Sequence, residues 1–138
     1  MTSLQILVGG DLRFTARLER EHAPRSCAAF SAVLPFTNRL IQARWSGESA
    51  WIPLGDFRFD VGAENATSTP APGQILLYPK GVSETEILFP YGETRFASRF
   101  GALAGNHFLT IVEGMDQLEE LGRRVLYEGA QDVTFRAR

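Results

Sequence analysis

Residues 105–116 constrain the fold more than any other part of this sequence. The segment begins with a small residue, continues as a largely apolar run over residues 108–112, and turns tightly at Gly114 before a helical pattern begins. Two strongly polar residues, Asn106 and His107, stand at the start of the apolar run. The pattern is typical of a strand in a β-barrel, with its polar residues at the mouth of the barrel, where a side chain can face a ligand.

Short strand-like runs separated by turns recur along the rest of the chain. Leu12–Leu18 alternates apolar and polar residues, which predicts a strand with one buried face. Gly9-Gly10-Asp11 before it predicts a hairpin with a strand over residues 4–8. The further strands that we expect cover residues 40–45, 50–54, 74–78, 84–89 and 133–135.

Two helices are expected, far apart in the sequence. Pro24 suits the first turn of a helix, and Pro35 ends that helix. Asp116 is the expected N-cap of the second helix, with Glu119 completing a capping box and Gly129 ending the helix. Many strands with two short helices predict a mainly β fold, a closed β-barrel capped by the helices, because closure leaves no exposed strand edge.

Length and composition predict one domain over residues 1–138. Hydrophobic residues make up 44% of the chain and charged residues 22%, an ordinary globular balance. The net charge of -2 predicts that the protein does not bind nucleic acid, because binding phosphates needs a clearly basic face. We see no signal-like segment and no run near the ~20 apolar residues of a membrane helix, so we expect a cytoplasmic protein without membrane contact. The one cysteine, Cys27, is expected in the core.

Two segments resemble cyclophilins. Residues 12–34 combine an alternating strand, an acidic turn with a proline and a helix that carries Phe30, in the order found in that family. Residues 112–116, followed by an amphipathic helix and a last strand, are the more specific likeness. Residues 105–109 also resemble the Gly-Ser-Gln-Phe-Phe segment that lines the cyclophilin pocket. The Phe-His-Arg motif that carries prolyl isomerisation has no match, so the resemblance implies the barrel without that activity.

Nearly the whole chain resembles a bacterial family of small cyclophilin-like proteins of unknown function. The residues that carry this resemblance are Leu34-Pro35-Phe36, Arg44-Trp45-Ser46-Gly47-Glu48, Glu64-Asn65, Pro70-Ala71-Pro72-Gly73, residues 84–92 and Gly105-Asn106-His107-Phe108. It implies a single cyclophilin-like barrel and no particular activity. A weaker similarity, in fold alone, links such domains to cucumopine synthase, which condenses histidine with a 2-oxo acid and closes a ring.

An arginine close to two tryptophans indicates a site for a carboxylate. The planar guanidinium of Arg44 could bind a carboxylate through two hydrogen bonds, with Trp45 and Trp51 as an aromatic wall. An arginine on the outside of a strand would give the same pattern. The other binding residues that we expect are Glu48, Asn65, Tyr91 and Asn106.

Several residues are candidates for acid–base chemistry. Glu84 and Glu86 are two apart on an expected strand, so they share a face, and close carboxyl groups can separate their pKa values. A strand that faces solvent would show the same spacing. His107 has a usual pKa near neutrality, and Glu64 is a further candidate for proton transfer. Since Asn106 and His107 alternate, only one of them can point into the barrel.

These residues predict a site for a small molecule, with no metal and no cofactor, since two distant histidines and one cysteine lack ligand spacing. The first hypothesis is an enzyme that uses acid–base chemistry on a carboxylate-bearing, nitrogen-containing metabolite, by closing or opening a ring or by hydrolysing an amide. The alternative is a non-catalytic module that binds a small ligand or peptide. Apolar Phe57, Phe59 and Phe100 in turn-rich regions are consistent with a homo-oligomer.

Overall fold

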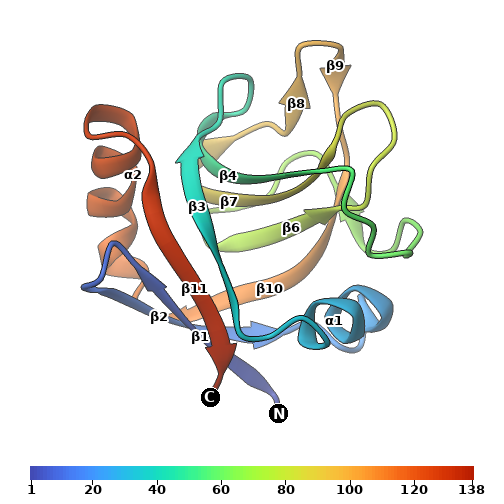
Figure 1. The fold of residues 1–138 in the computed structure, drawn as a ribbon. Helices are drawn as coiled ribbons and strands as arrows, with labels where there is room; N and C mark the ends of the chain where they lie inside the picture. Colours follow the sequence, from blue (N-terminus) through green and yellow to red (C-terminus); the bar gives the residue numbers. More distant parts are fainter.

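The computed structural model describes residues 1–138 and contains eleven strands and two α-helices (Figure 1). The helices are α1 (Pro24–Ser31) and α2 (Leu118–Tyr127), the second of which follows a 3₁₀ turn over Met115–Gln117. The strands are β1 (Ser3–Val8), β2 (Leu12–Leu18), β3 (Phe36–Gln42), β4 (Gly47–Gly55), β5 (Ala66–Thr67), β6 (Gln74–Tyr78), β7 (Thr85–Thr94), β8 (Ala97–Ser98), β9 (Gly101–Ala102), β10 (Gly105–Glu113) and β11 (Gln131–Ala137).

Eight of the strands form a closed antiparallel barrel. Hydrogen-bonded neighbours run in the order β2-β1-β11-β3-β4-β7-β6-β10, and β10 pairs with β2 to complete the ring. Each strand alternates between an inward and an outward face, as β2 does with buried Phe14 and Ala16 beside exposed Arg13 and Arg17. The mainly β fold and the closed barrel with two short helices are therefore confirmed.

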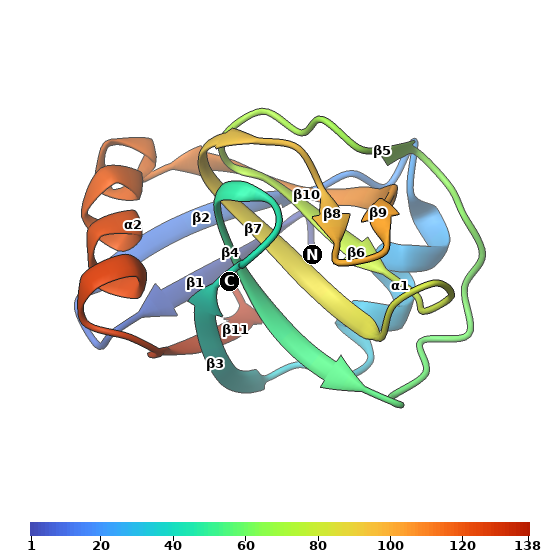
Figure 2. The ribbon, with the colours of Figure 1, turned by 90° about the horizontal axis from the view of Figure 1, so that it is seen from above.

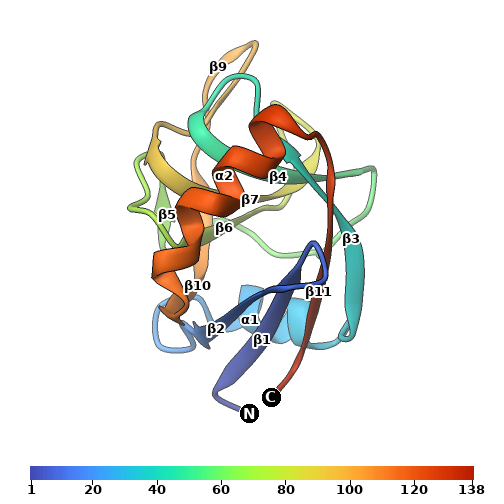
Figure 3. The same cartoon turned by 90° about the vertical axis from the view of Figure 1, so that its left-hand side faces the viewer.

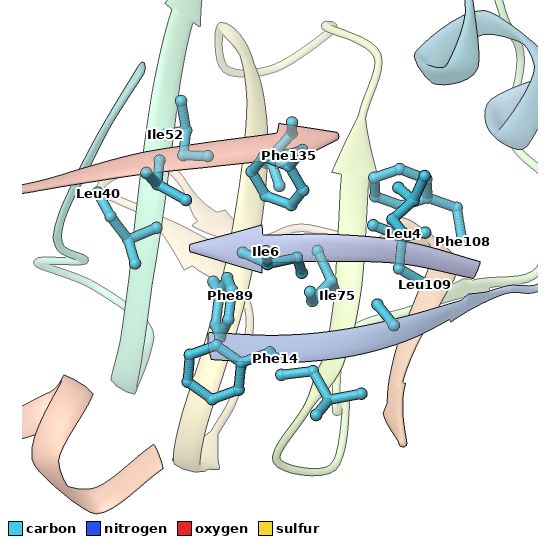
Figure 4. Packing of buried hydrophobic residues seen from close by; sticks show 14 of the residues in the cluster. Leu4, Ile6, Phe14, Leu40, Ile52, Ile75, Phe89, Phe108, Leu109 and Phe135 are labelled. Carbon is cyan, nitrogen blue, oxygen red and sulfur yellow. The ribbon is translucent and has the colours of Figure 1, made fainter. Parts of the chain in front are cut away.

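A continuous apolar cluster fills the barrel interior. It contains 26 buried residues, and the rings of Phe14 and Phe89 meet edge to face at 5.9 Å between centroids (Figure 4). Ile6 and Ile75 are fully buried in the same cluster. Because side chains occupy the interior, a ligand site has to lie elsewhere on the molecule.

The two helices lie at opposite ends of the barrel (Figure 2). On α1, the Phe30 ring meets those of Phe108 and Phe135 edge to face, with centroid distances of 5.3 and 5.2 Å. At the other end, α2 lies across the barrel (Figure 3). Its own residues Leu121 and Val125 are buried. Neither helix is long and apolar enough to span a membrane.

Gly122 lies at the close contact between α2 and β7, where an added methyl group would overlap the ring of Tyr91. We expect Gly122→Ala to destabilise the protein by about 1–3 kcal/mol, because the added methyl group forces the helix outward. The higher helix propensity of alanine offsets only part of this cost. Urea unfolding measures the change. Gly62→Ala is the matched control, since its Cβ would meet nothing within 4 Å. Equal unfolding midpoints for the two variants would contradict this packing.

Several element ends differ from the sequence prediction. The first helix, expected to run as far as Pro35, already ends at Ser31. Asp116 does not cap α2, because the left-handed turn at Gly114 starts a 3₁₀ turn that contains Asp116. The strand expected to end at residue 89 continues through Pro90 to Thr94, since its ladder with β4 is irregular beyond Pro90 and tolerates a missing N–H. The strand expected over residues 40–45 is β3, which begins earlier, at Phe36, where it pairs with β11. It ends at Gln42, so Arg44 and Trp45 lie in the connection that follows it.

Candidate functional site

A pocket of about 540 Å³ lies on the outer face of strands β4 and β7. The β3–β4 connection (teal) and the β6–β7 connection (yellow-green) flank it, and the β8–β9 hairpin lies beside them (Figure 1). A second apolar cluster, which includes Leu76, Leu88 and Phe96, packs against this outer face. The volume is that of a typical site for a small molecule.

Glu86 lies at the floor of this pocket. On β7, Ile87 and Phe89 belong to the barrel core, so Glu86 and Leu88 point to the outer face. Glu86 is only 5% exposed, and its carboxyl group has no hydrogen-bond partner in the protein. The fold therefore holds a largely buried carboxyl group at the pocket with no partner from the protein.

Burial raises the pKa of Glu86 to about 8, and the neighbouring Glu84 carboxylate adds to the increase. At neutral pH, Glu86 is therefore mostly a neutral acid that can donate a proton. Glu84 also lines the pocket but is exposed, and its Oε1 accepts a hydrogen bond from the Gly55 N–H at 3.0 Å. The two carboxyl groups thus differ sharply in environment.

Two arginines without a carboxylate partner line the same pocket. The Arg44 guanidinium lies 5.4 Å from the Trp45 ring centroid, and that of Arg99 lies 4.7 Å from the Phe100 centroid. A third cation at the rim, Lys80, is paired with an aspartate at 2.7 Å. The pocket therefore offers two free cations and exposed aromatic rings around a buried carboxylic acid.

The sequence-predicted site residues fall into three places. Five of them line the pocket, namely Arg44, Trp45, Trp51, Glu84 and Glu86. The pocket also contains Arg99 and Phe100, which sequence reasoning missed. The sequence shows only an Arg-Phe pair directly before Gly101. The strands on either side of this pair are two residues long, which is too short for an alternating pattern that would predict them.

Asn106 and Glu64 belong to a second place, beside α1. Asn106 is 1% exposed, and its amide donates to Ser26 Oγ at 3.0 Å and to the Gly62 carbonyl at 2.9 Å. Its side-chain oxygen accepts the Glu64 N–H at 3.1 Å, while the Glu64 carboxylate accepts the Ser26 N–H at 2.6 Å. This network fastens the long β4–β6 connection to α1 and β10.

We expect Asn106→Ala to lower the free energy of unfolding by about 2–4 kcal/mol, because it removes one buried and two partly buried hydrogen bonds and leaves their partners unsatisfied. Urea unfolding measures the loss. Asn38→Ala is the control, since it breaks a single hydrogen bond to the neighbouring Arg39 N–H. A loss no larger than that of Asn38→Ala would contradict the structural role of Asn106.

His107 lies near this network, on β10, and is half-buried. The His107 Nε2 is 2.7 Å from Thr110 Oγ1, and that hydroxyl donates to the Glu19 carboxylate at 2.7 Å. The Asn65 amide donates to the backbone carbonyl of His107 at 2.9 Å. Burial lowers the pKa of His107 below its usual value. His107 does not line the pocket that contains Glu86, so the structure does not bring these two candidates together.

Glu48 and Tyr91 occupy a third place, in a groove beside α2. The Tyr91 hydroxyl donates to Gln42 Oε1 at 2.6 Å, and Glu48 accepts the Glu93 N–H at 2.8 Å. No three histidine, cysteine, aspartate or glutamate side chains are grouped to hold a metal ion. Cys27 is buried as expected, and burial raises the pKa of its thiol to about 11.

Comparison with known protein families decides the affiliation of the chain. The model of a family described as proteins of unknown function, DUF3830, matches residues 6–137. The chain belongs to the DUF3830 family. Membership of a family of unknown function, expected from the sequence, is thereby confirmed. A search of curated proteins found no match for this DUF3830 member.

Two solved structures share the fold of this DUF3830 member. McbB in complex with tryptophan superposes with a TM-score of 0.75 and 19% identity, over 98% of this chain and 44% of McbB. The hypothetical protein AF2241 from Archaeoglobus fulgidus has a TM-score of 0.62 and 16% identity, over 99% of this chain and 95% of AF2241. The chain thus spans less than half the length of McbB, and the likeness concerns the fold alone.

Proposed function

We propose that this protein binds a small carboxylate-bearing, nitrogen-containing molecule in the pocket above Glu86 and acts on it by acid–base chemistry. The observation that carries the proposal is the buried Glu86 carboxyl group, which faces the pocket without a hydrogen-bond partner. Burying such a group opposes folding, and groups of this kind concentrate at functional sites. Closing or opening a ring, or hydrolysing an amide, are reactions that suit one proton-transferring carboxyl group.

The remaining pocket residues support a ligand of this class. Arg44 and Arg99 offer unpaired cations to a carboxylate, and Trp51 with Trp45 offers an apolar wall. McbB was solved with tryptophan, which combines a carboxylate, an amine and an aromatic ring. A ligand held by its carboxylate at the arginines would present its nitrogen-bearing part to Glu86.

In this proposal, neutral Glu86 donates a proton to the nitrogen or oxygen atom that becomes more basic during the reaction. The carboxylate that remains then takes a proton back from the ligand or from water. Glu84 favours this return, because two neighbouring negative charges repel each other. His107 and Glu64, the other predicted proton-transfer residues, do not line this pocket, so we assign the proton transfer to Glu86.

A thermal-shift screen tests the proposal, with amino acids, 2-oxo acids, hydantoins and cyclic amides as probes. A compound at 100 times its Kd should stabilise the protein by roughly 2.7 kcal/mol. Arg44→Gln should remove the shift, whereas Arg25→Gln, an exposed arginine on α1 outside the pocket, should retain it. Mass spectrometry then reports whether the binding compound is consumed. A screen without any binding carboxylate contradicts the proposal, and binding without consumption favours the non-catalytic module.

A further inference from the structure

The β8–β9 hairpin has a fixed base. Phe96 and Leu103, which flank it, are 1% and 4% exposed and pack in the outer apolar cluster. The Leu103 N–H donates to the Phe96 carbonyl at 3.0 Å. Ser46 holds the first hairpin residue, because its hydroxyl oxygen accepts the Ala97 N–H at 3.1 Å. The hairpin is therefore held in place beside the pocket.

The hairpin tip, by contrast, makes few contacts. The two tip residues, Arg99 and Phe100, are exposed, and the Phe100 N–H is hydrogen-bonded only locally, to Ser98 Oγ at 3.1 Å. Phe100 lines the pocket, yet it is 65% exposed. An apolar ring held at the rim of a pocket by a fixed base is available to cover the apolar part of a bound molecule.

The charge at the tip is also uncompensated. Arg99 has no carboxylate within salt-bridge distance, and its guanidinium lies over the Phe100 ring. Arg44 reaches the same pocket from the β3–β4 connection, on a different element, and is likewise unpaired. Two arginines from separate elements can hold one carboxylate more strongly and with more defined geometry than either alone.

We propose that Arg99 and Phe100 determine ligand specificity, with Arg99 joining Arg44 on the ligand carboxylate and Phe100 covering the apolar part of the ligand. The inference rests on the proposed function, since it concerns the same pocket. It adds a segment outside the barrel to the recognition machinery. It also assigns the ligand class more narrowly, as an amino acid with a large apolar or aromatic side chain.

Isothermal titration calorimetry with L-tryptophan and with tryptamine, which lacks the carboxylate, tests this assignment. Wild-type protein should bind L-tryptophan at least tenfold more tightly than tryptamine. Arg99→Gln should weaken L-tryptophan binding by about tenfold to a hundredfold and leave tryptamine binding unchanged, because only a charge-assisted contact is lost. Phe100→Ala should weaken the binding of both compounds by several-fold to about tenfold, because both carry the apolar ring.

Two variants outside the pocket serve as matched controls. Arg25→Gln removes an exposed arginine on α1, and Tyr127→Ala removes an aromatic ring that is 78% exposed at the end of α2. Both should bind L-tryptophan as the wild-type protein does, and circular dichroism should show all variants folded. Arg99→Lys should retain part of the affinity for L-tryptophan, since lysine keeps the charge without the planar guanidinium.

The outcomes separate this inference from the proposed function. Wild-type protein that does not bind L-tryptophan, or that binds tryptamine equally well, contradicts the inference. Folded Arg99→Gln and Phe100→Ala variants with wild-type affinity also contradict it. If Glu86→Gln abolishes turnover while those two variants behave as wild type, the proposed function stands and the inference fails. If Glu86→Gln leaves turnover unchanged while Arg99→Gln weakens binding, the proposed reaction fails and the specificity assignment stands.

Discussion

Replacing Glu86 with glutamine is expected to lower turnover by about 10²–10⁴-fold while leaving ligand affinity within a few-fold of wild type. Glutamine fills the same space but cannot transfer a proton, and the Glu86 carboxyl has no hydrogen bond in the protein to lose. The measurement is kcat, with Kd determined separately, for the compound that the screen shows to be consumed.

Two further variants test whether the effect belongs to Glu86. Glu84→Gln should lower turnover far less, because Glu84 is exposed and hydrogen-bonded to the Gly55 N–H. Glu119→Gln, on an exposed part of α2 outside this pocket, should behave as wild type. Wild-type kcat in the Glu86→Gln variant would exclude the proposed reaction and leave a binding pocket.

The second large effect is on stability against pH. In the folded protein Glu86 keeps its proton up to a pKa of about 8, while the unfolded chain loses it near the ordinary value of 4.5. The folded state therefore binds one proton more between these values, so stability falls as pH rises. Each pH unit removes about 1.4 kcal/mol, or about 5 kcal/mol across the window. This contribution is complete below pH 4.5 and lost above about pH 8.

Urea unfolding of wild type and Glu86→Gln at several pH values measures this effect. The difference between the two curves isolates Glu86 from the other titrating groups. The wild-type free energy of unfolding should fall relative to the variant between pH 4.5 and 8, and the two curves should run parallel outside that window. Curves that stay parallel throughout would mean that the Glu86 carboxyl titrates normally in the folded protein.

The barrel could be predicted from local patterns. The alternation from Leu12 to Leu18 sets one buried face, and the Gly9-Gly10 turn gives the hairpin that the structure has. Some of the predicted site residues also lie together in the structure. Trp51 and Glu86 lie on neighbouring strands, and the antiparallel register places Trp51 opposite Leu88 and Pro53 opposite Glu86. Trp51 on β4 and Glu86 with Leu88 on β7 thus meet on the outer face of the two paired strands.

The sequence could not place the pocket outside the barrel. On β7 the residues from Thr85 to Pro90 are all buried, because the core covers one face and the hairpin region covers the other. Alternation then no longer distinguishes the interior from the exterior. The role of Asn106 was equally inaccessible, since its partners Ser26 and Gly62 lie 80 and 44 residues away in the chain.

The central claim is that Glu86 is a buried, protonated carboxylic acid facing a ligand pocket. A carbon NMR titration of the glutamate carboxyl groups tests it most directly, with Glu86→Gln used to assign the Glu86 signal. The expected midpoint is about 8, and the signal should shift when the binding carboxylate from the screen is added. A midpoint at the ordinary value of 4.5, with no response to that compound, would contradict the account.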